Sequence, residues 1–211
     1  MKSTSVGIIV FPDVEVLDFA GPFEVFSVTR LNEETRYSNS SPFDVFLVAE
    51  TEDPVVATGG LRVLPAHSLE TCPALDVLVV PGGLGTRVQV DNTRLIQWIR
   101  EQAARVRTLT SVCTGSFLLG QAGLLDGLRA TTHWRSLDRM AETFPSIRVE
   151  REQHVVEEGP VLTSAGISAG IDMALRVVAR YHGEAVARAT ARHMEYPYPE
   201  TNERRIQGSA G

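Results

Sequence analysis

The sequence predicts an α/β fold, a doubly wound and mostly parallel sheet with helices on both faces. First, apolar runs of strand length alternate with helix-length patterns along most of the 211 residues. Second, the runs Val6–Phe11 and Leu75–Val80 are almost wholly apolar, as expected of parallel strands that are covered on both faces. Third, an apolar run ends at Cys113 and continues at once as a helical pattern, which is typical of a nucleophile elbow at the carboxyl edge of such a sheet.

The predicted elements alternate in chain order. Short apolar or β-branched runs indicate strands, and apolar residues three to four positions apart indicate helices. Strands are expected at Val6–Phe11, Phe43–Ala49, Leu75–Val80, Thr108–Val112, Arg129–Thr132 and Val161–Ser164. Helices are expected at about Phe19–Leu31, Asn92–Arg105, Gly115–Ala122, Trp134–Phe144, Ile171–Tyr181 and Glu184–Glu195.

Two further segments carry the turn signals that join antiparallel strands. Thr58–Leu64 contains a Gly-Gly pair and is expected to form a hairpin or an edge strand. Arg148–Val156, followed by the turn sequence Glu157–Pro160, is expected to be another antiparallel excursion. The polar stretch Asn32–Ser41 is expected to be the most mobile loop.

Residues 1–196 are expected to form a single domain. The chain is 43% hydrophobic, which can fill one sizeable core, and no linker of biased composition divides it. The segment 197–211 contains two prolines and is expected to leave the core as a C-terminal tail, with Arg204 and Arg205 in solvent.

Charge and cysteine content argue against several classes of protein. The formal net charge is −6 and the pI is about 5.4, whereas nucleic-acid-binding proteins carry a clustered basic surface. The apolar run that starts at Val6 is interrupted at Pro12, too early for a signal peptide, and no run reaches the roughly 18 apolar residues of a membrane span. The cysteines Cys72 and Cys113 fit a reducing compartment. We therefore expect a cytoplasmic protein that binds neither nucleic acid nor membrane.

Cys113 stands at the junction of a predicted strand and a predicted helix. A side chain at such a junction is held in a sharp turn and lifted toward the carboxyl edge of the sheet. The helix begins at Thr114, so its unpaired N–H groups and the positive end of its dipole lie beside the sulfur. Because both favour the thiolate, the pKa of Cys113 is expected to lie below the value of about 8.5 for a free thiol.

A glycine-rich turn, Pro81–Gly85, follows the buried strand Leu75–Val80 and is expected at the same edge of the sheet. In one interpretation the Gly83 N–H is half of an oxyanion hole, with the other half supplied by the N–H of Thr114 or Gly115. In the other, the turn only requires positive φ angles that glycine tolerates. The turn has neither the lysine nor the spacing of a phosphate-binding loop.

Asp18 lies where the first helix begins, and its carboxylate admits two interpretations. Aspartate is a favoured helix N-cap, which would account for it completely. The start of this helix also faces the carboxyl edge of the sheet, where a carboxylate can meet the Cys113 sulfur and carry protons. Glu24, further along the same helix, is a weaker candidate for that role.

His133 follows the predicted strand Arg129–Thr132 and is a candidate base, because cysteine chemistry commonly uses a histidine that is near in space. Packing beside Trp134 for structural reasons explains it equally well. Cys72 is interpreted as an incidental thiol. No metal site is expected, because the other histidines are scattered without ligand spacing: His67, His154, His182 and His193.

Five motifs together resemble one superfamily. They are V-L-D-F-A-G-P-F-E-V-F from Val16, V-P-G-G to Gly83, S-V-C-T-G-S around Cys113, G-L-L-D-G-L-R-A-T-T-H-W through His133 and T-S-A-G-I-S-A-G-I-D to Asp172. With them, the chain resembles the ThiJ/PfpI superfamily, which is related to class I glutamine amidotransferases, over roughly residues 6–195. Within it, the chain is similar to isonitrile hydratases and to the ligand-sensing domains of AraC-type regulators.

The resemblance implies roles for individual residues. Cys113 matches the elbow cysteine, Asp18 the acid that hydrogen-bonds it, and Gly83 the oxyanion glycine. Thr114 matches the threonine after the nucleophile in isonitrile hydratases, and His133 falls where some glyoxalase-type relatives have a histidine. PfpI-type peptidases carry histidine at the position of Thr114, so proteolysis is not expected. The resemblance implies no cofactor and a homodimer.

These residues leave three functions open, each with a small-molecule substrate or ligand. The first is an isonitrile hydratase-like enzyme, in which Cys113 attacks the terminal isonitrile carbon, Asp18 moves protons and water releases an N-substituted formamide. The second is a cofactor-independent glyoxalase, in which Cys113 adds to a 2-oxoaldehyde and His133 moves the proton. The third is a non-catalytic sensor of a ligand or an oxidant. DNA binding is not expected, because little chain follows residue 195 to form a helix-turn-helix module.

Overall fold

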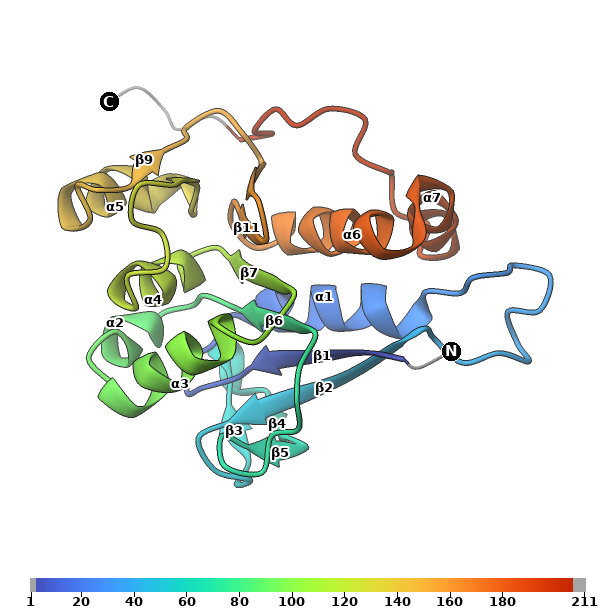
Figure 1. The fold of residues 1–211 in the computed structure, drawn as a ribbon, viewed down its shortest axis with the longest axis horizontal. Helices are drawn as coiled ribbons and strands as arrows, with labels where there is room; N and C mark the ends of the chain where they lie inside the picture. Colours follow the sequence, from blue (N-terminus) through green and yellow to red (C-terminus); the bar gives the residue numbers. More distant parts are fainter. Residues whose placement is uncertain (1–2, 207–211) are drawn as a thin grey trace.

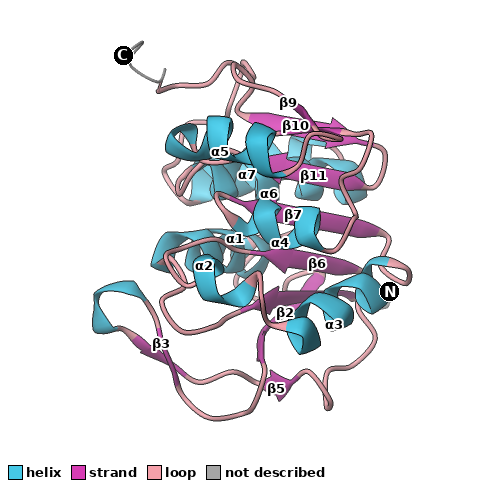
Figure 2. Cartoon of the chain, turned by 90° about the vertical axis from the view of Figure 1, so that its left-hand side faces the viewer, coloured by secondary structure: helices cyan, strands magenta, loops and turns pink. Residues whose placement is uncertain are grey.

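A computed structural model describes residues 3–206 and confirms the predicted α/β fold (Figure 1). Its centre is one seven-stranded sheet, in which every neighbouring pair is parallel except β10 and β11. Figure 2 shows the strands stacked from β5 at one edge to β10 at the other. In sheet order the strands are β10 (Val155–Glu158), β11 (Val161–Ser164), β7 (Thr108–Val112), β6 (Val77–Val80), β1 (Thr4–Ile9), β2 (Phe43–Ala49) and β5 (His67–Ser68).

Helices cover both faces of this sheet. Two groups pack among themselves, one of α1, α6 and α7 and the other of α2, α3 and α4 (Figure 1). In chain order the helices are α1 (Val16–Val28), α2 (Thr86–Gln89), α3 (Thr93–Ala103), α4 (Gly115–Gln121), α5 (Leu137–Thr143), α6 (Ala169–His182) and α7 (Glu184–His193). No helix within residues 3–206 is long and apolar enough to cross a bilayer.

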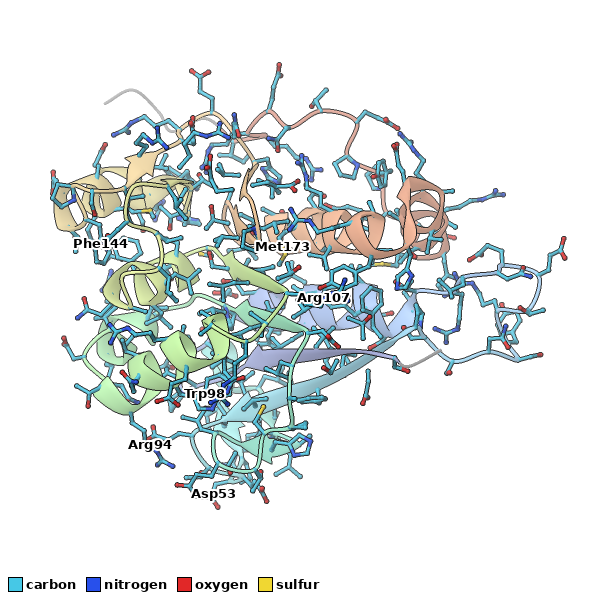
Figure 3. All side chains as sticks on the ribbon, viewed as in Figure 1. Asp53, Arg94, Trp98, Arg107, Phe144 and Met173 are labelled. Atoms are coloured by element: carbon cyan, nitrogen blue, oxygen red, sulfur yellow. The ribbon has the colours of Figure 1, made fainter. Side chains whose placement is uncertain are left out.

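The central strands are buried between the two helix layers, as their apolar sequences predict. Every residue of β6 and of β7 is buried. Helix α3 shows how a neighbouring element is fixed: the Asn92 side chain caps its start by accepting from the Leu95 N–H at 3.2 Å. Its buried Trp98 donates to the carbonyl of Leu69 at 2.9 Å (Figure 3). These two hydrogen bonds fix the start of α3 and join this helix to the segment after β5.

The strand expected at Arg129–Thr132 forms over only half of its length. Only β8 (Arg129–Ala130) forms, and it pairs with β9 (Arg148–Val149) in a separate two-stranded sheet. The backbone N–H of Thr131 donates to the Thr163 side-chain oxygen at 2.9 Å instead of to a strand carbonyl. A side-chain partner thus replaces the ladder, which residue propensity does not reveal.

Two antiparallel features agree with expectation, and two small elements were not predicted. A hairpin joins β3 (Val55–Val56) to β4 (Arg62–Val63) through a 3₁₀ turn at Thr58–Gly60, where Gly59 and Gly60 have φ of 77° and 84°. The excursion after residue 148 ends in the antiparallel pair of β10 and β11. The short elements α2 and β5 were not predicted from the sequence, because four and two residues carry too little periodicity to be recognised.

The expectation that the C-terminal segment leaves the core is wrong for its described part. His154 donates its backbone N–H to the carbonyl of Asn202 at 2.8 Å, and Arg204 donates its own to Glu152 at 2.6 Å. Arg204 is only 8% exposed. The segment lies beside the otherwise open edge of the sheet at β10, where free strand groups need hydrogen-bond partners. Residues 207–211 lie outside the described residues.

Candidate active site

Cys113 occupies the strained turn that the sequence predicts. It follows β7 directly, and its φ of 56° lies in the left-handed region that residues with a side chain rarely adopt. Its backbone N–H donates to the carbonyl of Ala165 at 3.1 Å. A Cβ on Gly115 would lie 2.0 Å from the Val80 carbonyl oxygen, so only glycine can start α4 so close to β6. Packing on both sides therefore holds the elbow in its strained form.

Asp18 does not cap its helix, contrary to one of its two interpretations. The residue before α1 is Glu15, and Asp18 lies inside the first turn with no exposed surface. Its Oδ2 accepts from the backbone N–H of Gly82 at 2.9 Å, across from α1 to the loop after β6. Its Oδ1 is buried without a hydrogen-bond partner among residues 3–206. Such a carboxyl oxygen is unusual and marks a functional candidate.

The environment of Asp18 favours its protonated form. Burial raises its pKa to about 8, the Gly82 N–H opposes this rise, and the nearby Glu15 charge adds to it. Interaction with the Cys113 side chain opposes the rise more weakly, which places the carboxyl beside the thiol. The main cause of the raised pKa of Asp18 is therefore the loss of water around its carboxyl.

The expectation of a lowered thiol pKa is wrong. Burial raises the pKa of Cys113, which is only 6% exposed, and the Asp18 charge raises it further. Hydrogen bonds from the backbone N–H groups of Thr114 and Ile167 lower it by less. The predicted helix effect thus exists but is outweighed by dehydration. Near neutral pH the pair therefore holds both protons, as a neutral acid beside a neutral thiol.

Thr114 joins the elbow to the glycine turn. The Gly83 N–H donates to Thr114 Oγ1 at 3.0 Å, and the Thr86 hydroxyl donates to the same oxygen at 3.1 Å. Gly83 has a φ of 128°, and a Cβ there would lie 2.4 Å from the Glu15 backbone nitrogen, so both the turn and the close approach require glycine. The Gly83 N–H can donate a hydrogen bond to a substrate atom only after the Thr114 hydroxyl, its present acceptor, turns aside.

Replacing Gly82 by alanine is expected to damage the site. The added Cβ would lie 2.5 Å from the backbone nitrogen of Thr114 and 2.9 Å from Asp18 Oδ2. Because the first of these atoms is backbone, the loop must shift, at an expected cost of about 1–3 kcal/mol. Urea denaturation measures this loss. An unchanged unfolding midpoint, together with unchanged alkylation of Cys113, would contradict the packing described here.

His133 directly follows Thr132, whose hydroxyl contacts the Cys113 carbonyl, but no hydrogen bond joins the His133 side chain to Cys113 among residues 3–206. Its Nδ1 accepts from the Arg135 backbone N–H at 3.3 Å, and its ring packs so tightly on Gly166 that a Cβ there would lie 2.0 Å from it. Burial, with the charges of Arg135 and Arg204, lowers the pKa of His133, so the ring is neutral near pH 7. Glu24 is exposed on α1 and does not join the site.

Two residues near Cys113, Ile167 and Thr132, were not predicted from the sequence. Ile167 has a φ of 58°, and its backbone N–H lowers the pKa of both Asp18 and Cys113. Thr132 donates its hydroxyl to the carbonyl of Cys113 at 2.9 Å. Ile167 acts through its own backbone and Thr132 through a hydroxyl bonded to the backbone of Cys113. The only signal for either residue was its place inside the recognised motifs. Within residues 3–206 no group of three or more His, Cys, Asp or Glu residues could hold a metal ion.

The stability of the protein is expected to fall with rising pH because of Asp18. Its pKa is about 8 in the folded chain against 3.8 for an ordinary aspartate, so the folded state holds the proton more tightly. The contribution of Asp18 to the free energy of unfolding is fully present below about pH 4. It falls by up to about 1.4 kcal/mol per pH unit as the pH rises from there, and it is lost once the pH has passed about 8. Asp18→Asn should remove this loss. Urea denaturation of both proteins from pH 5 to about pH 9 tests it, and a constant difference between them would contradict it.

Comparison with known proteins places this chain in a family. The sequence profile of the DJ-1/PfpI family matches residues 4–180. An isonitrile hydratase of Pseudomonas putida is 39% identical over 191 residues, covering 90% of this chain and 78% of its own. The HTH-type transcriptional regulator CdhR of Pseudomonas aeruginosa is 34% identical over 168 residues, which are 78% of this chain and 49% of the regulator. The chain thus spans about half the length of that regulator.

Solved structures agree. A ThiJ/PfpI family protein from Pseudomonas syringae superposes with a TM-score of 0.81 at 33% identity, covering 96% of this chain and 79% of its own. An AraC family transcriptional regulator from Pseudomonas putida superposes with a TM-score of 0.76 at 21% identity, covering 90% and 99% of the two chains, and shows the fold alone. The family profile covers most of this chain, and the isonitrile hydratase is 39% identical over 90% of it. The chain therefore belongs to the DJ-1/PfpI family.

Proposed function

We propose that this chain is a cysteine-dependent hydratase of small carbon–nitrogen electrophiles such as isonitriles, which it converts into N-substituted formamides. One observation carries the proposal: a buried carboxyl, Asp18, whose pKa is raised to about 8, lies beside the thiol of Cys113 at a strained elbow. A carboxyl with such a pKa can both give and take a proton near neutral pH. Identity of 39% to an isonitrile hydratase over 90% of this chain supports the choice of substrate class.

The neutral pair suits a reaction in which protons move as bonds form. The Cys113 sulfur attacks the terminal carbon of the isonitrile while Asp18 adds its proton to the same carbon. The thiol proton passes to the Asp18 carboxylate, so the product is a thioimidate and the acid is restored. No isolated charge has to be formed in the dehydrated site, where a charge would be costly.

Water completes the reaction. It adds to the thioimidate carbon, the nitrogen takes a proton from Asp18, and Asp18 recovers one from the attacking water. The carbon–sulfur bond then breaks, which releases the formamide and returns the thiol. Two moderate barriers thus replace one high barrier. In this scheme Thr114 and the Gly83 N–H orient the substrate, and no cofactor takes part.

A product assay tests this function. Purified protein is mixed with a simple alkyl isonitrile or with methylglyoxal, and proton NMR follows the formyl signal of a formamide or the methyl signal of lactate. We expect formamide from the isonitrile with wild-type protein and none with Cys113→Ala. Lactate formation without formamide would replace the hydratase by the glyoxalase, and His133 would then be the proton carrier to test.

A sensing role is the second candidate, and one observation favours it. The chain is 34% identical to the regulator CdhR over 78% of its own length. Under this alternative the site at Cys113 senses a ligand or an oxidant without turnover, and neither substrate reacts in the assay. A homodimer stays a prediction of the family resemblance, which sedimentation of the purified chain would test.

A further inference from the structure

We propose that Arg204, on the C-terminal segment, is a positioning residue for the turn that carries Cys113 and for His133. The proposal rests on the proposed function only in taking Cys113 as the reacting group. Its basis is a continuous set of hydrogen bonds that begins in this segment and ends at the elbow.

The first part of this set fixes the segment before His133. Arg204 Nη2 donates to the carbonyl of Thr132 at 3.1 Å and to the hydroxyl oxygen of Thr131. Arg204 Nε donates to the carbonyl of Arg151 at 2.7 Å, so the guanidinium is held on two sides. One rigid group therefore joins two loops that lie more than fifty residues before it in the chain.

The second part reaches the elbow. The hydroxyl of Thr132 donates to the carbonyl of Cys113 at 2.9 Å. The strained backbone of Cys113 is thus held by Thr132, whose own carbonyl is held by Arg204. A φ of 56° costs energy and persists only where surrounding contacts fix it. We infer that Arg204 supplies part of this fixation.

The charge of Arg204 has a second consequence. No carboxylate pairs with Arg204 among residues 3–206, and the side chain is 8% exposed, so its charge is poorly screened. Burying an unpaired charge costs free energy, so a neutral side chain would join the two loops with a smaller loss of stability. Partial burial against Gly166 lowers the pKa of His133, and the positive charges of Arg135 and Arg204 both lower it further. They are the charged groups that act on this imidazole, and they keep it neutral.

Arg205 offers a matched control. It is the next residue of the same segment, but its guanidinium binds Asp172 on α6 at 2.8 Å and the Tyr196 hydroxyl at 3.1 Å. It makes no hydrogen bond to residues 131–133 within the described chain. Loosening the segment through Arg205 therefore leaves the contacts of Arg204 in place.

Alkylation of the two cysteines by iodoacetamide, with NMR titration of His133, tests the proposal without any substrate. In Arg204→Gln we expect Cys113 to react about 10-fold faster than in wild type, because the elbow loosens, while Cys72 reacts at an unchanged rate. The pKa of His133 should rise. Arg204→Lys should keep the pKa of His133 low, because lysine retains the positive charge. It should still allow faster alkylation of Cys113, because lysine lacks the several N–H donors of the planar guanidinium. Arg205→Gln should change neither property.

Other outcomes overturn the proposal. Equal acceleration of Cys72 and Cys113 would show that Arg204 serves only global stability. If Arg204→Gln and Arg205→Gln changed the Cys113 alkylation rate and the His133 pKa equally, the role would belong to the segment as a whole. If both quantities in Arg204→Gln stayed at their wild-type values, Arg204 would have no positioning role. Because neither readout uses an isonitrile, a failure of the hydratase assay would leave these results independent of it.

Discussion

Asp18→Asn is expected to lower turnover of an alkyl isonitrile by a factor on the order of 100 or more, because it removes the proton that the attacked carbon receives. Asparagine has nearly the same shape, and its side-chain oxygen can still accept from the Gly82 N–H. At pH 7 the wild-type carboxyl is already mostly protonated, with a pKa of about 8, so the variant should fold at least as stably. The rate of formamide formation and the urea midpoint measure the two effects.

Glu24→Gln is the control for this variant. Glu24 lies on the same helix α1 but is exposed, and its side chain forms no hydrogen bond among the described residues. It should turn over substrate at the wild-type rate. Normal turnover by Asp18→Asn would reduce Asp18 to a buried structural acid and leave His133 as the better candidate for proton transfer.

Cys113→Ala is expected to abolish hydration, with a loss on the order of 10⁴-fold or more, because no other group near Asp18 can form the covalent intermediate. Removing a buried sulfur at a strained backbone leaves a small cavity, at an expected cost of about 1 kcal/mol. The loss of rate should therefore far exceed the loss of stability. Steady-state rates and thermal unfolding, measured on the same preparation, separate them.

The second cysteine supplies the control. Cys72 is partly buried in a loop, and burial raises its pKa to about 11. Cys72→Ala should keep full turnover. If Cys113→Ala kept more than about one per cent of the rate while Cys72→Ala lost it, the nucleophile would have been misassigned.

The fold could be predicted because its strands are marked by composition. Leu75–Val80 and Thr108–Val112 are mostly apolar or β-branched, and the buried strands β6 and β7 form within them. The strand expected at Arg129–Thr132 ends after Ala130, because Thr131 donates its N–H to a side chain rather than to a neighbouring strand. Arg204 was expected in solvent, because charged side chains near a chain end are usually exposed. Its guanidinium instead donates hydrogen bonds to carbonyl oxygens in two loops. Such long-range partners leave no periodic signal.

The site was predicted in position but not in its protonation. The elbow at Cys113 follows from a strand that meets a helix, and Asp18 follows from the matching edge of the sheet. Helix-end effects on the thiol can be read from the sequence, whereas dehydration cannot, because it depends on how α1 and the turn at Ile167 close over the sulfur. That difference reversed the expected direction of the thiol pKa.

Trapping the covalent intermediate tests the central claim most directly. Protein in excess is mixed with an alkyl isonitrile, quenched at intervals in cold denaturant and digested rapidly for peptide mass spectrometry. The account predicts that the Cys113 peptide gains the mass of the isonitrile, because thiol and isonitrile add without loss of any atom. This adduct should rise and then decay as formamide accumulates, more slowly in Asp18→Asn. The Cys72 peptide stays unmodified. Formamide that accumulates while the Cys113 peptide is unmodified in both proteins, or the absence of any reaction, would contradict it.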